Sequence, residues 1–182
     1  MAPAISKELV LDAAESVVRD VGASHMTLDA VAERAGISKG GLLHNFPNKD
    51  ALLQGMINRM MEAVEAARER ARQHLEKQNA DELTVEIQML ADLDAAVPCR
   101  GATFLAVLAN QPELLRPFHD SISQRFSKDI LVGEHSQQAS VLYLAAMGLH
   151  LSRLLNIPLL TAEQRAKTYG YLLKQAQGNK EI

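Results

Sequence analysis

Apolar residues recur at helical spacing along most of the chain. In residues 10–22 (VLDAAESVVRDVG) the apolar positions form one stripe with a period of 3.6 residues rather than 2. No segment alternates between apolar and polar positions with turn pairs beside it, so the sequence predicts an all-α protein. By the same spacing, further helices are expected over residues 28–35, 38–46, 48–79, 82–93, 101–108, 112–130, 134–156 and 161–177.

Residues 27–53 carry the signals of short helices joined by a tight turn. Thr27 and Ser38 have side chains that cap helix N-termini. Gly36 ends the first of these helices, since glycine adopts the left-handed backbone at little cost. Pro47 ends the second one, and Asn48 can cap the long helix that follows. Two short helices joined by a glycine-containing turn form a helix-turn-helix unit, whose second helix enters the major groove of DNA.

Spaced residues of this stretch also resemble a known signature. The pattern T-x-x-x-x-A-x-x-A-G-I-S-K-G-x-L-x-x-x-F-P-x-K-x-x-L is similar to the DNA-binding signature of the tetracycline-repressor (TetR) family of bacterial regulators. Residues 10–22 resemble that family's first helix, so the likeness covers about the first quarter of the chain. Two positions depart from the commonest pattern: Gly41 stands where Thr, Ser or Ala is frequent, and Leu43 where Tyr is frequent.

The second helix of the motif is therefore the expected DNA-binding element. Lys39 opens it, where its amine and the helix N-terminus can both meet a phosphate. The missing side chains of two glycines let the backbone approach DNA closely, which offsets a cost of roughly 1–2 kcal/mol for glycine in a helix. Leu43 either contacts a thymine methyl or is a flank residue, and Thr27 contacts phosphate, caps its helix or does both. The full set of DNA-binding candidates is Thr27, Ser38, Lys39, Gly40, Gly41, Leu43, His44, Asn45 and Lys49.

Charge and cysteine content narrow this interpretation. The net charge is −3 and the pI about 6.1, which is not the general basicity of a protein that coats nucleic acid. The first fifty residues hold five Lys and Arg side chains against seven acids, so any positive footprint must be narrow and centred on Lys39 and Lys49. Cys99 is the single cysteine, which rules out an internal disulfide. With no apolar run long enough for a membrane span, the cytoplasm is the expected location.

The remainder of the chain is expected to form a second domain. The long helix is apolar at its start and charged in its second half, so the domain boundary is placed on it, with residues 1–47 as the DNA-binding domain and 48–182 as the other. Asn79 with Glu82, and Thr161 with Gln164, have the spacing of reciprocal caps for the helices that follow them.

The resemblance implies that residues 48–182 dimerise and hold a small hydrophobic or amphipathic effector. His150 is either a hydrogen-bonded core residue or a pocket residue, and Gln88 or Cys99 could add a polar contact. The ligand-binding candidates are Ile87, Leu90, Phe104, Leu108, Phe118, Ile122 and His150. The helices within 134–156 and 161–177 are expected to pair with those of a second copy in a four-helix bundle. The interface candidates are Val141, Leu144, Gly148, Leu151, Leu155, Tyr169 and Leu172.

Other kinds of site lack support in the sequence. The histidines have no metal-binding spacing, and we expect no metal and no cofactor. We find no nucleophile elbow, phosphate loop or paired-carboxylate pattern, so we do not expect an enzyme. The leading interpretation is a homodimeric, cytoplasmic regulator, most simply a repressor, of a double-stranded DNA operator. The alternatives are an effector-independent helix-turn-helix protein and an all-α enzyme with a DNA-binding head.

Overall fold

The structure is a computed structural model that describes residues 6–22, 25–76, 79–96, 101–130 and 136–178. Within these ranges the side chains of Ala102, Phe104 and Asp129 are not described. The described residues form helices and turns and no strand, which confirms the all-α prediction. Residues 1–61 and 100–117 make up one compact unit, unit 1, and residues 62–99 and 118–182 make up a second, unit 2.

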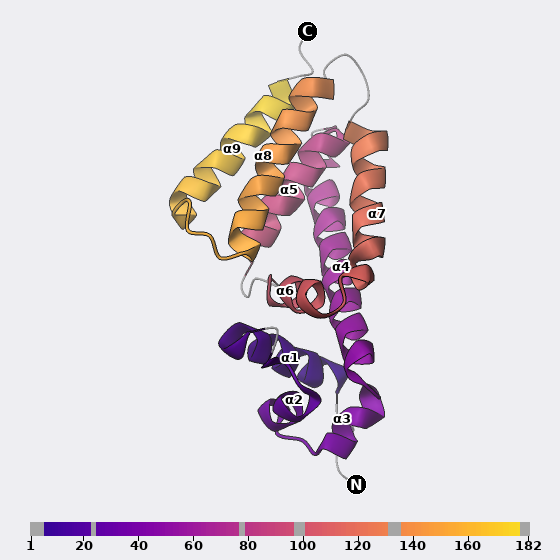
Figure 1. The fold of residues 1–182 in the computed structure, drawn as a ribbon. Coiled ribbons are helices and arrows are strands. Elements are labelled where there is room, and N and C mark those ends of the chain that lie inside the picture. The colour runs from indigo at the N-terminus through magenta and orange to yellow at the C-terminus, as the bar shows by residue number, and fades with distance from the viewer. Residues whose placement is uncertain (1–5, 23–24, 77–78, 97–100, 131–135, 179–182) are drawn as a thin grey trace. The chain divides into compact units, whose positions relative to one another are not determined.

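Unit 1 contains three short helices, the start of a long one and a helix from the middle of the chain. In Figure 1, α1 lies against α2 and α6. Their largest buried side chains, among them Met26, Leu42 and Met56, form an apolar core. The helices are α1 (Lys7–Val21), α2 (Leu28–Ala35), α3 (Lys39–Asn45), the first part of α4 (Lys49–Leu75), α6 (Gly101–Asn110) and a 3-10 turn (Pro112–Leu115).

Buried polar contacts also tie unit 1 together. Arg59 on α4 is an almost fully buried cation that pairs with three acids of α1, one of which is Glu15 at 2.8 Å. Glu15 also accepts a hydrogen bond from Thr103 Oγ1 on α6 at 2.9 Å. A paired charge in the interior avoids the cost of an uncompensated one. These contacts join α1, α4 and α6 within unit 1.

Unit 2 is built around α5. Figure 1 shows α5, α8 and α9 side by side, and their buried side chains form one core that includes Ile87, Leu90, Tyr143 and Leu172. The helices of unit 2 are the second part of α4, α5 (Glu82–Ala95), most of α7 (Arg116–Arg125), a π-helical turn (Phe126–Ile130), α8 (Ser136–Leu154) and α9 (Ala162–Gly178).

Helix ends agree with the sequence where the cap is local. Ser6, Thr27 and Ser38 each accept a backbone hydrogen bond at the start of a helix, and Asn48 accepts one from the amide of Ala51. Thr161 and Gln164 exchange the two bonds expected of a reciprocal cap. The compact units divide α4 after Met61 and place residues 100–117 in unit 1, while the domain limits at residues 47 and 48 stay a prediction.

Two predictions about helix ends were wrong. Asn79 and Glu82 do not cap α5: Asn79 has a positive φ of 48°, and the carboxylate of Asp81 accepts the bonds of Thr84 N and Oγ1 instead. Asp81 lies three residues before Thr84, the spacing at which a capping side chain reaches a free amide. The helix expected over 112–130 is divided into a 3-10 turn, α7 and a π-helical turn. None of the described helices is both long and apolar enough to cross a membrane.

Candidate DNA-binding surface and ligand cavity

Side-chain caps at the helix N-termini stabilise the helix-turn-helix of unit 1. Thr27 Oγ1 accepts from the amide of Ala30 at 3.1 Å, and Ser38 Oγ accepts from the amide of Gly41 at 3.1 Å. Between them Gly36 adopts the left-handed conformation, with φ 65° and ψ 32°. Glycine suits this conformation because it has no Cβ to clash. The turn therefore sets the direction of α3 relative to α2.

Helix α3 buries one side and exposes the other. Leu42 is fully buried, and Phe46 directly after the helix is nearly so. Lys39, Gly40 and His44 are exposed on the rest of the helix. The remaining candidates on or near it, Gly41, Leu43, Asn45 and Lys49, are half-buried, and Thr27 and Ser38 are exposed. The apolar anchors thus leave a polar and glycine-containing surface for a partner.

Gly40 has no structural need to be glycine inside its own chain. Its φ is not positive, and a Cβ built on it would meet no described atom within 4 Å. Glycine in a helix costs about 0.5–1 kcal/mol relative to alanine. An alanine would therefore fit at this position as far as the chain itself is concerned.

The two lysines of the candidate surface have different surroundings. Lys39 Nζ lies 3.0 Å from the carboxylate of Asp29, and both side chains are more than half exposed. An exposed ion pair of this kind is worth little and exchanges readily for another anion. Lys49 Nζ donates to Asn110 Oδ1 on α6 at 2.8 Å and is half-buried. Lys39 is therefore the more accessible of the two for phosphate.

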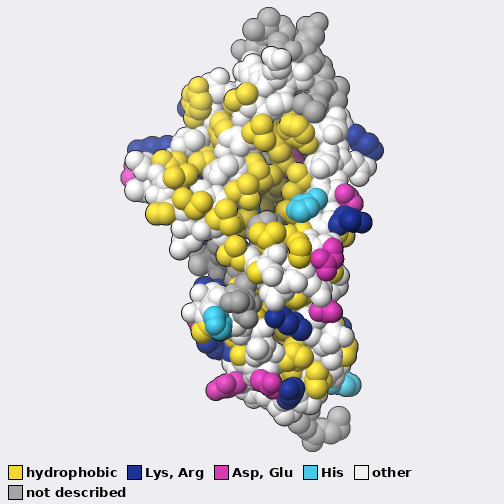
Figure 2. Space-filling view, in the orientation of Figure 1, with side chains coloured by type: hydrophobic (Ala, Val, Ile, Leu, Met, Phe, Trp, Pro, Cys, Tyr) yellow, Lys and Arg dark blue, Asp and Glu magenta, His cyan; other side chains and the backbone are white. Residues whose placement is uncertain are grey.

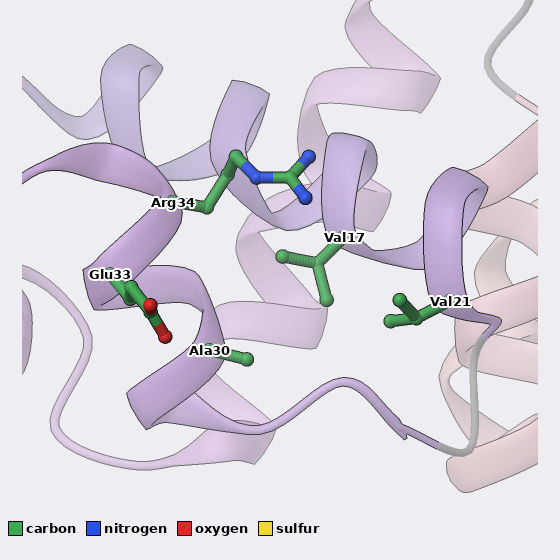
Figure 3. Close-up of a pocket in the computed structure, with 5 residues that line it drawn as sticks. All are labelled: Val17, Val21, Ala30, Glu33 and Arg34. Atoms are coloured by element: carbon green, nitrogen blue, oxygen red, sulfur yellow. The ribbon is translucent and has the colours of Figure 1, made fainter.

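A hollow on unit 1 lies between α1 and α2. Figure 3 shows Val17 and Val21 on one side of it and Ala30, Glu33 and Arg34 on the other. The volume of the hollow is about 370 Å³. The guanidinium of Arg34 donates to Ser16 and, at 2.5 Å, to Asp20, and this contact lowers the pKa of Asp20. The guanidinium of Arg34 is therefore already engaged by side chains of α1.

Unit 2 contains a partly open cavity between α4, α5, α7 and α8. It brings together four of the predicted ligand-binding residues, Leu90, Phe118, Ile122 and His150. Its volume is about 30 Å³, which is room for about one water molecule. The remaining lining residues were not among the ligand-binding candidates: Val64, Glu86, Met89, Leu93, Arg125, Tyr143 and Met147.

The other predicted ligand-binding residues lie elsewhere. Ile87 is fully buried in the core of unit 2 but does not line the cavity. Leu108 is on α6 in unit 1, where it is 46% exposed, so it belongs to a different unit from the cavity. The side chain of Phe104 and all of Cys99 fall outside the described residues, and Gln88 donates to Asp92 rather than reaching the cavity.

One end of the cavity is charged. Glu86 on α5 is 2% exposed and accepts a hydrogen bond from Arg68 Nε at 2.7 Å, while Arg125 Nε lies 3.5 Å away. Burial raises the pKa of Glu86 against the opposing effect of the two guanidinium groups. Burial also raises the pKa of Tyr143 to about 12, so its hydroxyl stays protonated at neutral pH. This buried charged cluster could not be predicted from the sequence, because charged residues on a helix usually lie on its solvated face.

The other end of the cavity carries His150. Its Nδ1 lies 2.8 Å from Oδ1 of Asp94, a carboxylate that is only 2% exposed. Arg165 is 3.6 Å from the second oxygen of Asp94. The sequence left open whether His150 is a core or a cavity residue; it lines the cavity and is also hydrogen-bonded. Among the described residues, no group of three His, Cys, Asp or Glu could hold a metal ion.

Helix α8 exposes an apolar stripe to the surface. Figure 2 shows hydrophobic side chains gathered over the part of unit 2 that carries α8 and α9. Val141 and Leu144 are 66% and 60% exposed, and Leu151 and Leu155 are exposed as well. Gly148 lies between them, with open space where its Cβ would stand. These five interface candidates therefore have surface available for a second chain.

Two interface candidates on α9 have no such surface. Tyr169 and Leu172 are 3% and 5% exposed and lie in the core of unit 2, and burial raises the pKa of Tyr169. As buried residues of unit 2 they offer a second chain little surface, because apolar spacing alone cannot tell which face of a helix meets its own chain. Tyr171, which the sequence analysis did not single out, is 61% exposed on the same helix.

Comparisons with known proteins agree with this architecture. The family model described as bacterial regulatory proteins of the tetR family matches residues 10–56, and the tetracycline repressor-like C-terminal domain matches residues 87–177, half of the chain. No curated protein matches the chain in sequence.

Solved structures with the same fold share little sequence with the chain. A transcriptional regulator from Rhodococcus sp. Rha1 is 19% identical over 96% of this chain and 97% of its own, with a TM-score of 0.69. SmeT in complex with triclosan is 16% identical over 95% and 90%, with a TM-score of 0.64. The fatty acid degradation regulator FadR from Bacillus halodurans is 14% identical over 95% and 98%, with a TM-score of 0.61. With the two domain matches, these observations show that the chain belongs to the tetR family of bacterial transcriptional regulators.

Proposed function

We propose that the protein is a homodimeric repressor that leaves its operator when a small amphipathic effector binds. In this proposal residues 1–47 bind a near-palindromic operator, and residues 48–182 dimerise and hold the effector. The observation that carries it is the capped helix-turn-helix, whose α3 buries Leu42 and leaves Lys39, Gly40 and His44 exposed. A helix fixed in this way can lie in the major groove with its exposed side toward the bases.

The DNA contacts are divided between positioning and sequence recognition. Lys39 and Lys49, with the hydroxyls of Thr27 and Ser38, are suited to phosphate, which fixes position without selecting sequence. His44 is exposed on α3 and can donate to base edges, and the methyls of Leu43 can meet a thymine methyl. These roles follow the residue types and the exposure of α3.

The dimer is supported by the apolar stripe on α8. Val141, Leu144, Gly148, Leu151 and Leu155 alternate steps of three and four residues, which places them along one side of a helix. A two-fold contact uses the same patch on both chains, so one stripe is sufficient. A dimer would present two copies of α3 to two half-sites about one helical turn of DNA apart.

Effector control would use elements that occur in both units. Helix α4 begins in unit 1 and continues in unit 2, where Val64 lines the cavity. One structural neighbour, SmeT, was solved with triclosan, and this supports a largely apolar ligand for this chain. If a ligand stabilises an α4 position that separates the two heads, operator affinity falls, typically by 1–3 kcal/mol of coupling.

The small volume of the cavity supports a second candidate, an effector-independent DNA-binding protein. A drug-sized ligand needs roughly 300 Å³ or more, against about 30 Å³ here. A thermal-shift screen of small molecules, followed by operator titration by fluorescence anisotropy with each compound that raises the melting temperature, separates the two candidates. Release of operator by a stabilising compound supports the repressor. Stabilising compounds that leave operator affinity unchanged would contradict effector control, and turnover of any compound would favour an enzyme.

A further inference from the structure

The cavity of unit 2 has a polar group at each end and an apolar middle. Tyr143 and His150 are seven residues apart on α8, which separates them by about 10 Å along the helix. Arg125 and Phe118 are likewise seven residues apart on α7. Arg125 lies beside Glu86 at the same end as Tyr143, whose pKa Glu86 influences. The lining is therefore elongated, and its apolar residues include Met89, Leu90, Ile122 and Met147.

Arg125 is the least satisfied charged group in this lining. Its side chain is 15% exposed, and its Nε is buried without a hydrogen-bond partner among the described residues. Its carboxylate neighbours, Glu86 and Glu65, are 3.5 and 4.0 Å away, and its guanidinium donates to Ser121 Oγ on its own helix at 2.9 Å. A guanidinium prefers two short parallel bonds to one carboxylate. Arg125 therefore has donor capacity that its own chain does not use well.

Glu86 does not depend on Arg125 for a partner. It is held at 2.7 Å by Arg68, and Arg68 is itself fixed by Glu82 at 2.7 Å. An anion that takes Arg125 would leave Glu86 in a short, charge-assisted hydrogen bond. A cationic ligand has no acceptor for the guanidinium donors of Arg125, whereas an anion has. The arrangement of charge thus favours an anionic head group over a cationic one.

We propose that the cavity binds an amphipathic carboxylic acid about 10 Å long, with its carboxylate on Arg125 and its apolar tail directed toward His150. This inference rests on the proposed function, of which it specifies the effector class. The carboxylate would form the paired bonds that Arg125 lacks, and the tail would lie among Met89, Leu90, Ile122 and Met147. These apolar side chains fix the ligand's character, and the guanidinium fixes its orientation.

The ligand enters by moving the least anchored wall. None of the residues of α7, all of which the structure describes, is fully buried, whereas α5 has eight buried residues. Displacing α7 therefore exposes less apolar surface than displacing α5. Met89 and Met147 have unbranched side chains that repack easily around a new shape. Opening on the α7 side increases the present volume of about 30 Å³ without breaking the α5–α8–α9 core.

Three probes with the same eight-carbon chain test the inference: octanoate, 1-octanol and octyltrimethylammonium. Calorimetric titration of the full-length protein should give tightest binding for octanoate, at least tenfold tighter than 1-octanol, and weakest binding for the cation. Arg125→Met should reduce octanoate affinity at least tenfold and leave 1-octanol affinity unchanged, which also reports that the cavity is intact. Arg125→Lys, which keeps the charge but loses the fork, should have an intermediate effect.

The matched control is Arg72→Met. Arg72 belongs to the same charge network through Glu82 but does not line the cavity, so octanoate affinity should be retained. Three results would overturn the inference. The first is that 1-octanol or the cation binds as tightly as octanoate or more tightly, and the second is that Arg125→Met keeps the preference for octanoate. The third is that none of the probes binds. The proposed function is tested separately, by adding each bound probe to the protein–operator complex: release by a neutral or cationic ligand would retain the repressor and reject the carboxylic acid.

Discussion

Replacing Gly40 with alanine should change folding stability and DNA affinity in opposite directions. The backbone of Gly40 is not in the left-handed region, and the added methyl would meet no described atom within 4 Å. Alanine restricts the unfolded chain and favours the helix. G40A should therefore raise the free energy of unfolding by about 0.5–1 kcal/mol. For a chain of this length this is a rise in melting temperature of roughly 1–4 °C.

The same methyl should weaken operator binding if α3 approaches DNA through Gly40. Moving the helix outward would lengthen at least one hydrogen bond to a phosphate, and such charged bonds are worth about 1.5–3 kcal/mol. The expected loss of affinity is roughly 10- to 100-fold. Differential scanning calorimetry gives the stability change, and fluorescence anisotropy with a labelled operator gives the affinity.

Gly170→Ala is the matched control for G40A. Gly170 is on α9, also has open space for a Cβ and belongs to unit 2. The Gly170→Ala variant should be stabilised to a similar degree as G40A, with no change in operator affinity. A G40A variant that is more stable and binds DNA as well as the wild type would refute the close approach of α3 to DNA at this position.

Three further predictions concern the surface lysines, the α8 stripe and the buried contacts of unit 1. Lys39→Ala and Lys49→Ala should each weaken binding to all DNA sequences and lower the slope of log affinity against log salt concentration by about 1. Fluorescence anisotropy over a salt series measures both effects. A loss of affinity for one DNA sequence only would argue against a phosphate contact. Leu144→Glu should give folded monomers with reduced operator affinity, because Leu144 is 60% exposed in the single chain. Sedimentation would contradict this prediction if the variant remained a dimer, or if the wild type were a monomer at micromolar concentration. Thr103→Val should lower the free energy of unfolding by roughly 1–3 kcal/mol, because the buried Glu15 loses a hydrogen-bond donor. A denaturant titration that shows no change would mean that this hydrogen bond does not stabilise the fold.

Local signals were the part of the fold that the sequence predicted well. The caps at Thr27, Ser38 and Thr161 depend on atoms within three residues, so residue type and spacing are sufficient to find them. The left-handed turn at Gly36 is equally local. The error at Asn79 was also local, because Asp81, two residues further along the chain, provides the cap instead.

Long-range partners were the part that could not be predicted. Arg125 and Glu86 are 39 positions apart, and each looks like an exposed charge on its own helix until α5 and α7 are brought together. Tyr169 and Leu172 have the apolar spacing of an interface, but their helix turns that side toward α5 and α8. Apolar periodicity identifies a buried face without identifying what covers it.

The central claim is that the exposed side of α3 recognises a two-fold operator, and selection of DNA from a random library by the full-length protein tests it most directly. Sequencing the bound fraction should give one near-palindromic motif with half-site centres about one helical turn apart. The same selection with His44→Ala should relax the preference at one position in each half-site, at a cost of roughly 1–3 kcal/mol. A bound fraction with no enriched motif, or a motif that lacks two-fold symmetry, would contradict the account.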